Sequence, residues 1–428
     1  MRDLKIFTDN IEDKALEEIN LLMKQEAFKD SKVRIMPDVH AGMGCVIGFA
    51  GDLGDKVIPN VVGVDIGCGM LTVKLGNIDL DLEKLDKVIR ENIPSGFNVH
   101  EGRKVKFEKL KDLKCYRELR DTKRLERSLG TLGGGNHFIE IDVDEDNNKY
   151  LIIHTGSRNL GKQVADIYQY LANQLCNYNI EEYKTKQKEL IEKYKQLGEK
   201  QKIQKALGDL VKEYKISSNK IPKDLAYLEG EYRKNYLHDM SICQEFAQDN
   251  RIKIAEYILC NYFELPYYRG YKSVRLREKP TSSHYFYTQD MVEKDFYYFE
   301  TIHNYIDLDS NIVRKGAISA KKDEIVLIPI NMKDGCIIAK GKGNKDWNES
   351  APHGAGRIMS RRKAKETLNL EEYKESMKDI YSTSVNENTL DEAPSVYKPM
   401  QEIIDNIQDT VEILRIIKPI YNFKASDQ

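Results

Sequence analysis

Apolar residues along this chain follow two spacings, one typical of helices and the other of strands. Residues 11–28 and 82–93 place apolar side chains three or four positions apart between charged ones, which predicts amphipathic helices. Four short apolar runs are long enough for strands and too short for helices, at 71–75, 150–153, 325–330 and 336–339. This mixture predicts an α/β fold of the mixed α+β kind.

Residues 163–240 differ in character from the rest of the chain. They are rich in Lys, Glu, Gln and Tyr with helical periodicity, and Pro222 interrupts them. We expect a helical hairpin insertion within a single domain that spans 1–428, stabilised partly by charge pairs four residues apart. Its charged face suits a solvated surface, or alternatively a contact with RNA. A further helix is expected over 240–263.

Charge and cysteine usage limit the classes of protein that fit. The 428 residues include 67 basic and 69 acidic ones, with a net charge of −2, so any nucleic acid must bind a local basic patch. Seven cysteines show no paired framework, and Met1 leads into mixed polar sequence. No apolar stretch approaches the length of a bilayer span. We therefore expect a cytoplasmic protein without a membrane segment.

Residues 65–69, Asp-Ile-Gly-Cys-Gly, place a carboxylate and a thiol three positions apart in an apolar segment. Such a pair can supply two ligands to one metal ion, or a thiolate shared between two ions. The alternative is a buried cysteine in a glycine-rich turn, with the aspartate capping a helix.

Four of the eight histidines, at positions 137, 154, 303 and 353, lie in turns rich in small or polar residues beside apolar runs. Residues 133–137 read Gly-Gly-Gly-Asn-His, and 154–158 read His-Thr-Gly-Ser-Arg. A single histidine at a strand end is often structural. Together with Asp65 and Cys68, however, this set suits one or two metal ions and a phosphate-bearing substrate.

Residues 352–361 predict an anion site. If a helix begins near Gly356, Arg357 and Arg361 lie one turn apart on one face of it. The N–H groups at the helix N-terminus and the two arginine guanidinium groups could then bind phosphate beside His353. The alternative is a helix entry with a capping loop and an exposed basic face. Upstream, Asp38 and His40 alternate as they would at a strand end, so both could face one site.

The sequence has neither a Walker-type phosphate loop nor a dinucleotide-binding fingerprint. An enzyme that handles phosphate without those loops needs another way to activate phosphorus. A neutral imidazole that attacks phosphorus and then passes its group on is one such way.

Six segments, taken in order across nearly the whole chain, resemble the RtcB family of RNA-splicing ligases. They are 38–42 (Asp-Val-His-Ala-Gly), 65–69, 133–140, 154–158, 303–305 (His-Asn-Tyr) and 353–361 (His-Gly-Ala-Gly-Arg-Ile-Met-Ser-Arg). The resemblance implies stacked β-sheets flanked by helices around a central metal cleft. It also implies a ligase that uses GTP and two Mn²⁺ ions. The expected reaction joins an RNA 3′-phosphate or 2′,3′-cyclic phosphate end to a 5′-hydroxyl, in tRNA splicing or RNA repair.

The resemblance also assigns residues. His353 would be the nucleophile that carries GMP. The ligands of the two ions would be Asp65, Cys68, His137, His154 and His303, with Cys68 shared between them. Residues around the nucleotide would be Asn136, His137, Glu140, His303, Asn304, Pro329, Met332, Cys336, His353, Gly354, Ala355, Gly356 and Lys424. Phosphate or RNA would be held by Arg158, Arg357 and Arg361. The resemblance leaves open the need for an archease-like activator.

Two features complicate the resemblance. Thiolate and imidazole ligands alone would favour zinc over manganese. Many family members carry Pro-Gly-Ser-Met-Gly where this chain has Pro-Ile-Asn-Met-Lys at 329–333, and Cys336 stands where a serine is common. The nucleotide preference or the RNA substrate could therefore differ. The alternative functions are a metal-dependent phosphohydrolase acting on RNA ends and a non-catalytic RNA-binding scaffold.

Overall fold

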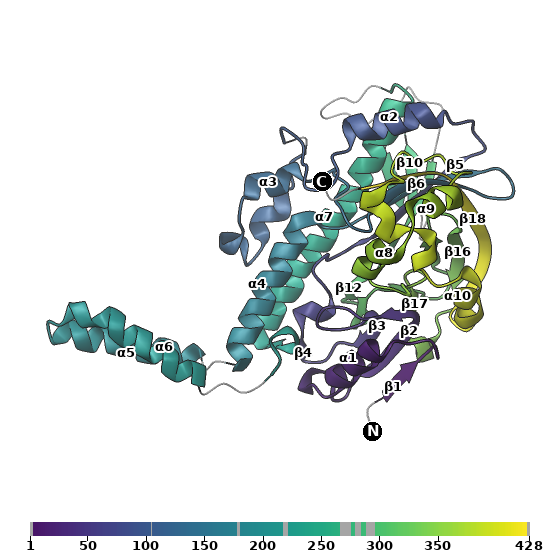
Figure 1. Cartoon of the computed structure of the whole chain (residues 1–428). Helices are drawn as coiled ribbons and strands as arrows, with labels where there is room; N and C mark the ends of the chain where they lie inside the picture. Colours follow the sequence, from purple (N-terminus) through teal and green to yellow (C-terminus); the bar gives the residue numbers. More distant parts are fainter. Residues whose placement is uncertain are drawn as a thin grey trace.

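The computed structural model describes residues 3–103, 105–177, 180–216, 221–265, 275–278, 284–287 and 296–425. A nine-stranded sheet, antiparallel at every pairing, forms its largest element (Figure 1). In spatial order its strands are β15 (Ile325–Asn331), β16 (Gly335–Gly341), β18 (Val411–Lys424), β6 (Phe138–Val143), β7 (Lys149–Thr155), β5 (Gly69–Gly76), β11 (Phe296–Ile302), β10 (His284–Tyr287) and β9 (Arg275–Glu278).

This sheet curls until β15, at one edge, approaches β11. The backbone N–H of Leu327 in β15 donates to Thr301 Oγ1 in β11 at 3.0 Å. Side chains on alternate positions of each strand point to opposite faces. Ile139 and Ile141 of β6 therefore pack on the outer face, whereas Phe138 packs inside the curl with Leu327.

Helices cover the outer face of the large sheet. The chief ones are α2 (Leu82–Asn92) and α7 (Gly230–Tyr262), with α4 (Arg158–Asn177) running beside α7 (Figure 1). Ile89 of α2 and Ile254 and Ile258 of α7 are buried against β5, β6 and β7. Each such side chain stabilises the fold by roughly 1.5–3 kcal/mol when it is fully buried.

A second sheet carries the N-terminal part of the chain. Its strands, in spatial order, are β1 (Asp3–Ile6), β2 (Lys32–His40), β3 (Ile47–Asp52), β13 (Ile312–Lys315) and β12 (Asn304–Asp307). Helix α1 (Asp13–Met23) buries Ile19 and Leu22 against it. Two small ribbons pair β4 (Lys56–Val57) with β8 (Leu228–Glu229), and β14 (Ala317–Ser319) with β17 (Ser350–Pro352).

The remaining helices are short or peripheral. They are α3 (Thr122–Arg127), α5 (Ile180–Gln196), α6 (Ile203–Ile216), α8 (Arg361–Thr367), α9 (Leu370–Ser376) and α10 (Met400–Ile407). Short 3-10 helices lie at Glu26–Phe28, Pro59–Val61, Glu108–Asp112, Tyr116–Glu118, Lys200–Lys202, Lys223–Leu225, Lys345–Trp347, Glu387–Glu392 and Pro394–Val396.

Within the described part of the range predicted as a helical insertion, α5 and α6 project from the body (Figure 1). They pack against each other. Asn177 closes the base of this hairpin, because its side chain accepts from the N–H of Ile221 at 3.1 Å and donates to the carbonyl of Ile221 at 2.9 Å. Helix α4 instead buries Val164 and Tyr168 in the main core. The division of the chain into a single domain with an insertion over 163–240 stays a prediction.

The mixed α/β fold class is confirmed. The helix predicted over 82–93 is α2, and the four predicted strands are β5, β7, β15 and β16. The helix predicted over 240–263 begins earlier, at Gly230, and forms the second half of α7. The helix predicted over 11–28 is shorter, since α1 ends at Met23 and a separate 3-10 turn follows at Glu26–Phe28. In the described part of the chain, no helix is long and apolar enough to cross a membrane.

Candidate active site

Four neighbouring strands of the large sheet bring the predicted metal ligands together at one end. Asp65 and Cys68 precede β5, His137 precedes β6, His154 lies in β7, and His303 follows β11. The register pairs Met70 with His154, Phe138 with His154, and Ile302 with Gly69. Sheet pairing therefore explains how ligands more than two hundred residues apart reach one place.

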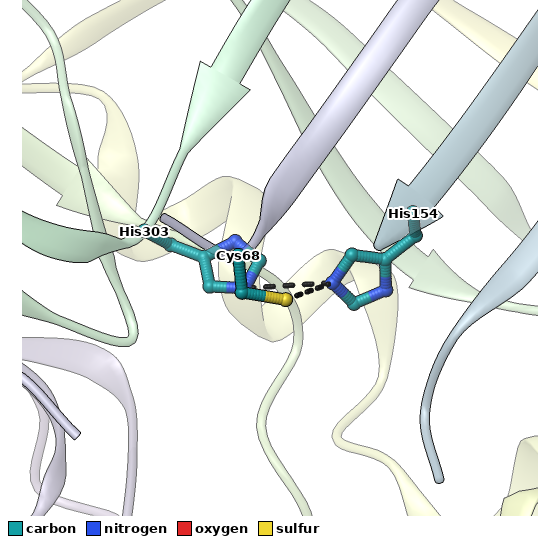
Figure 2. A group of neighbouring side chains, drawn as sticks. All are labelled: Cys68, His154 and His303. Atoms are coloured by element: carbon teal, nitrogen blue, oxygen red, sulfur yellow. Dashed lines mark hydrogen bonds between the residues drawn. The ribbon is translucent and has the colours of Figure 1, made fainter. Parts of the chain in front are cut away.

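Cys68 lies at the junction of two groups of ligand atoms. The first is Cys68, His154 and His303, in which His154 Nε2 lies 3.4 Å from Cys68 Sγ and 3.4 Å from His303 Nε2 (Figure 2). The second is Asp65, Cys68 and His137. There, His137 Nε2 lies 3.5 Å from Cys68 Sγ and 3.0 Å from Asp65 Oδ2. Nitrogen and sulfur ligands 2.0–2.3 Å from one tetrahedral ion lie about 3.3–3.7 Å apart, so the spacings of 3.4 and 3.5 Å suit metal coordination. The 3.0 Å between His137 and Asp65 is shorter and matches a hydrogen bond.

The hydrogen bonds behind the histidines show which ring nitrogens can bind a cation. His137 Nδ1 lies 2.9 Å from the carbonyl of Leu132, and His154 Nδ1 lies 3.1 Å from the carbonyl of Asn136. Because a carbonyl only accepts, both Nδ1 atoms carry the proton and both Nε2 lone pairs point at Cys68. Two imidazole lone pairs that converge on one cysteine sulfur fit a bound cation.

Burial favours the same protonation states. It lowers the pKa of His154 and of His303 well below the usual value, and neighbouring histidines lower both further. Both rings are therefore neutral, as metal ligands must be. Burial, and next the Asp65 carboxylate, raise the pKa of the Cys68 thiol well above its usual value, so the thiolate needs a cation beside it. The donor set fits two ions that share Cys68.

His353 lies beside this cluster and is oriented by Asp38. Strand β17 ends at Pro352, and β2 ends at His40, which brings the two segments together. Asp38 Oδ2 accepts from both the backbone N–H and Nδ1 of His353, at 3.0 and 2.6 Å. The ring of His353 lies 4.8 Å from that of His303, centroid to centroid. With Nδ1 donating to a buried carboxylate, Nε2 of His353 keeps its lone pair.

A cavity of about 220 Å³ opens next to His353. Most of the residues predicted to surround the nucleotide line it: Asn136, Glu140, His303, Pro329, Met332, His353, Gly354, Ala355, Gly356 and Lys424. His137, Asn304 and Cys336 do not line it. His137 faces the metal-ligand group, and Asn304 supports the ligand loop, since its carbonyl accepts from the N–H of Gly67 at 2.7 Å. Cys336 lies behind Glu140, inside the curled sheet.

Contrary to the prediction from the sequence, Arg357 and Arg361 do not lie on one helix. Helix α8 begins at Arg361 with Ser360 as its N-cap, so the prediction of a helix starting near Gly356 is wrong. Gly356 instead has φ of 74°, and a Cβ there would lie 2.3 Å from the carbonyl oxygen of Asp38. The chain turns back toward β2 at this point rather than entering a helix. Arg357 and Arg361 still line the cavity, and Glu392 pairs with both, at 3.3 and 2.9 Å.

Arg158 lies on the other side of the ligand cluster. It lines a second cavity, of about 430 Å³, together with Asp65, His137, Arg124 and Lys162. The guanidinium of Arg158 donates to Thr131 Oγ1 and to the carbonyl of Gly96, both at 3.1 Å. The metal-ligand cluster therefore lies between two cavities, each with basic side chains at its wall.

Two supporting residues, Arg251 and Asn250, were not predicted as members of the site. Asp38 was predicted to face it from its alternation with His40, and the structure adds its contact with His353. Arg251 of α7 donates to the carbonyls of Gly67 and Thr155, at 2.7 and 3.0 Å, which fixes two ligand loops. Asn250, beside it, accepts from the N–H groups of Gly130 and Thr131. No local motif in the sequence indicated these contacts of α7.

The fold and the site define a class of protein: a mixed α/β protein in which two adjoining metal-ligand groups share a cysteine beside an aspartate-oriented histidine. The sequence profile of the family described as tRNA-splicing ligase RtcB matches residues 24–119 and 115–425. The chain belongs to the RtcB family.

Individual relatives agree with this assignment. The chain is 29% identical over 417 residues to RNA-splicing ligase RtcB1 of Escherichia coli, covering 92% of this chain and 90% of that protein. The same figures describe RNA-splicing ligase RtcB of Escherichia coli K12. It is 25% identical over 454 residues to tRNA-splicing ligase RtcB of Nanoarchaeum equitans, covering 86% and 83% of the two chains.

Proposed function

We propose that this chain is a GTP-dependent RNA ligase that joins a 3′-phosphate or 2′,3′-cyclic phosphate end to a 5′-hydroxyl end through a histidine–GMP intermediate. The observation that carries the proposal is the position of His353. Asp38 holds its Nδ1, its ring neighbours the metal-ligand group, and it lines the cavity beside Gly354 and Gly356.

His353 would act as the nucleophile. The lone pair on Nε2 would attack the α-phosphorus of GTP, so that a P–N bond forms while the bond to pyrophosphate breaks. The positive charge that develops on the ring would be stabilised by the buried Asp38 carboxylate at Nδ1. A cyclic phosphate end would first be opened by water to a 3′-phosphate. An oxygen of the RNA 3′-phosphate would then attack the phosphorus of the histidine-bound GMP, so that the P–N bond breaks and GMP passes to the RNA. Attack of the 5′-hydroxyl on the activated phosphate would release GMP and form the phosphodiester.

Asp65, Cys68, His137, His154 and His303 would hold two Mn²⁺ ions. When bound, these ions would neutralise and orient the phosphate groups. Burial keeps bulk water away from the ligands, since all but Asp65 are buried. Zinc is the competitor that the thiolate and imidazoles would favour, so the identity of the ion is part of the test.

The nucleotide and the RNA would occupy the two cavities. Ala355 and Gly356 would let the phosphates approach the backbone beside His353, while Glu140 and Lys424 would contact the base. Arg357 and Arg361 would add positive charge to this cavity. Arg158, with Arg124 and Lys162, would hold the RNA phosphates in the second cavity. An archease-like protein is a candidate activator. The cytoplasm would suit the seven free cysteines.

Covalent transfer of labelled GMP from GTP to the protein tests whether His353 is the nucleophile. The purified protein, incubated with α-labelled GTP and Mn²⁺, should retain covalent label, and His353→Ala should retain none. His238→Ala is the matched control, because that ring lies on α7 and is 41% exposed. If the wild type binds GTP under these conditions but takes no label, His353 is not a nucleophile for GTP.

Defined RNA ends separate the ligase from a phosphohydrolase. With a 2′,3′-cyclic phosphate strand and a 5′-hydroxyl strand, the ligase should yield one joined product that depends on GTP. Loss of the cyclic phosphate without a joined product, in the presence of GTP and Mn²⁺, would instead identify a phosphohydrolase.

Removal of the shared thiolate tests the metal centre. Cys68→Ser should weaken Mn²⁺ binding by at least about tenfold and abolish labelling, because both ions lose a ligand. Cys176→Ser, on α4 and away from both cavities, should behave as the wild type. Full labelling of Cys68→Ser would show that Cys68 does not hold the metals.

A further inference from the structure

A second cluster of metal-binding side chains lies inside the curled sheet, apart from the Cys68 centre. Glu140 and Asp142 are two residues apart on β6, so they share a face of that strand. Cys336 lies on β16, and its Sγ is 3.9 Å from Glu140 Oε1. The two carboxylates and the thiol each place a ligand atom within 4.8 Å of the other two.

These side chains are buried, with exposed fractions of 2% for Glu140, 0% for Asp142 and 1% for Cys336. In the described part of the chain, no N–H group donates to either carboxylate oxygen of Asp142, although both are inaccessible to solvent. The polar groups beside Asp142 are the Glu140 carboxyl and the Cys336 thiol. Glu140 accepts a hydrogen bond from Asn422, whose own side-chain oxygen is also buried without a partner.

The described part of the chain supplies no cation to this cluster. No lysine or arginine there forms an ion pair with Glu140 or Asp142. Burial raises the pKa of Glu140. The basic group that opposes this shift is Lys424, which pairs with Glu392 at 2.8 Å. Burial, and next the charge of Glu140, raise the pKa of Asp142 well above its usual value. Two buried carboxylates without a counter-charge must either hold protons or bind a cation.

We propose that Glu140, Asp142 and Cys336 form an additional metal site for a divalent cation that accepts thiolate and carboxylate ligands together, with Zn²⁺ as the ion that fits best. Zn²⁺ is bound in proteins by cysteine and by aspartate or glutamate, whereas Mg²⁺ and Ca²⁺ take oxygen ligands only. The ion would supply the missing counter-charge to the Asp142 carboxylate.

The proposed metal site adjoins the cavity beside His353 through Glu140. Glu140 also lines the cavity beside His353, whereas Asp142 and Cys336 lie behind it. An ion bound between the three residues would fix the Glu140 carboxylate from behind. The proposal concerns binding alone and does not depend on the ligase reaction.

Metal content tests the proposal on the full-length protein. The chain is stripped with chelator, dialysed against Zn²⁺, and its bound zinc is measured by mass spectrometry. Asp142→Asn and Cys336→Ser should each bind one equivalent fewer than the wild type. Asp146→Asn, in the exposed turn after β6, is the matched control and should bind the wild-type amount. Equal zinc content in Asp142→Asn and the wild type would overturn the site and identify a protonated acid pair.

The absorption spectrum of the Co²⁺-loaded protein provides a second test of the site. It does not depend on whether the Asp142→Asn variant folds. In Cys68→Ser, a thiolate-to-Co²⁺ charge-transfer band should persist, because Cys336 still binds the ion. The band should disappear in the double variant Cys68→Ser, Cys336→Ser. Absence of the band in Cys68→Ser would overturn the proposal. Neither measurement uses GTP, so the failure of this site and the failure of His353 to take label are independent results.

Discussion

At the scale of single residues, the contact between Asp38 Oδ2 and His353 Nδ1 determines which ring nitrogen of His353 is free to react. At 2.6 Å it is short, and Asp38 is wholly buried. A carboxylate at this place selects the tautomer in which Nε2 is free, and it stabilises the cation formed on attack. The nucleophile would therefore depend on a residue more than three hundred positions away in the chain.

Asp38→Asn should lower the rate of labelling by GTP by roughly 10²–10⁴-fold, since the amide removes the stabilising charge while keeping the size of the side chain. Single-turnover labelling with saturating GTP measures this rate. Asp81→Asn is the control, because Asp81 caps α2 at the surface and asparagine caps helices as well as aspartate does. A wild-type labelling rate in Asp38→Asn would mean that another group orients His353.

The sequence could predict most of the ligand residues, because a histidine or cysteine in a glycine-rich turn leaves a local pattern. The local patterns alone could not show which of these candidate ligands lie close enough to share an ion; that expectation came from the family resemblance. The pairing of Cys68 with both His137 and His154 depends on strands β5, β6 and β7 lying side by side, which is a long-range property. The same holds for Asp142, which reads as one more polar position on a strand until the curl of the sheet encloses it.

At the scale of elements, helix α7 supports the site without entering it. Arg251 is 1% exposed and binds two carbonyls of the ligand loops as well as Glu300, at 2.8 Å. The periodicity of the sequence predicted a helix here, but it could not show that its buried face carries an arginine and an asparagine for loop support. Those contacts satisfy backbone groups that the loops leave unpaired.

Arg251→Lys should weaken Mn²⁺ binding and lower the free energy of unfolding by about 3–5 kcal/mol, since a lysine cannot bond two carbonyls and a carboxylate in the geometry of a guanidinium. Chemical denaturation and metal titration measure the two effects. Lys234→Ala, at an exposed position on the same helix, should change stability by less than about 1 kcal/mol. Arg251→Lys with unchanged metal affinity would show that α7 stabilises the fold but does not position the ligands.

No described residue of the α5–α6 hairpin lines either cavity of the candidate site. Its two helices pack on each other, and Asn177 and Ile221 close its base. Replacing residues 180–216 by a short Gly-Ser linker should leave labelling by GTP within about twofold of the wild type, because linkers that span closed loop ends cost little. A loss of joining for long structured RNA, with labelling intact, would assign the hairpin to substrate binding. Loss of labelling by GTP would show that the hairpin is needed for the reaction at His353.

At the scale of the whole molecule, the last strand closes the cavity and ties the C-terminal segment to the rest of the site. Strand β18 pairs with β6 and with β16, and Lys424 at its end binds Glu392 at 2.8 Å. Glu392 also binds Arg357 and Arg361, so three basic groups of the cavity wall meet at one buried carboxylate. The sequence showed the basic residues but not their shared partner, because Glu392 lies in an otherwise unremarkable 3-10 helix.

This carboxylate should make stability depend on pH. Burial alone would raise the pKa of Glu392, but Lys424 and then Arg361 outweigh it and lower the pKa to about 2. A carboxyl whose pKa is lower in the folded state stabilises the protein above the unfolded value, near 4.5. That stability is lost as the pH falls toward 2. A shift from 4.5 to about 2 corresponds to roughly 3 kcal/mol.

Glu392→Gln should therefore lower the free energy of unfolding at pH 7 by roughly 3 kcal/mol, because it removes the carboxylate with which Lys424 and Arg357 pair. Arg361 keeps its ion pair with Asp391. The variant should also lose less stability than the wild type between pH 4.5 and 2, since the titrating group is gone. Urea denaturation at a series of pH values measures both effects. Glu412→Gln, whose side chain is 56% exposed and pairs with Lys340, should shift the curve by less than about 1 kcal/mol at any pH. Parallel pH curves for Glu392→Gln and the wild type would show that Glu392 is not the group that titrates.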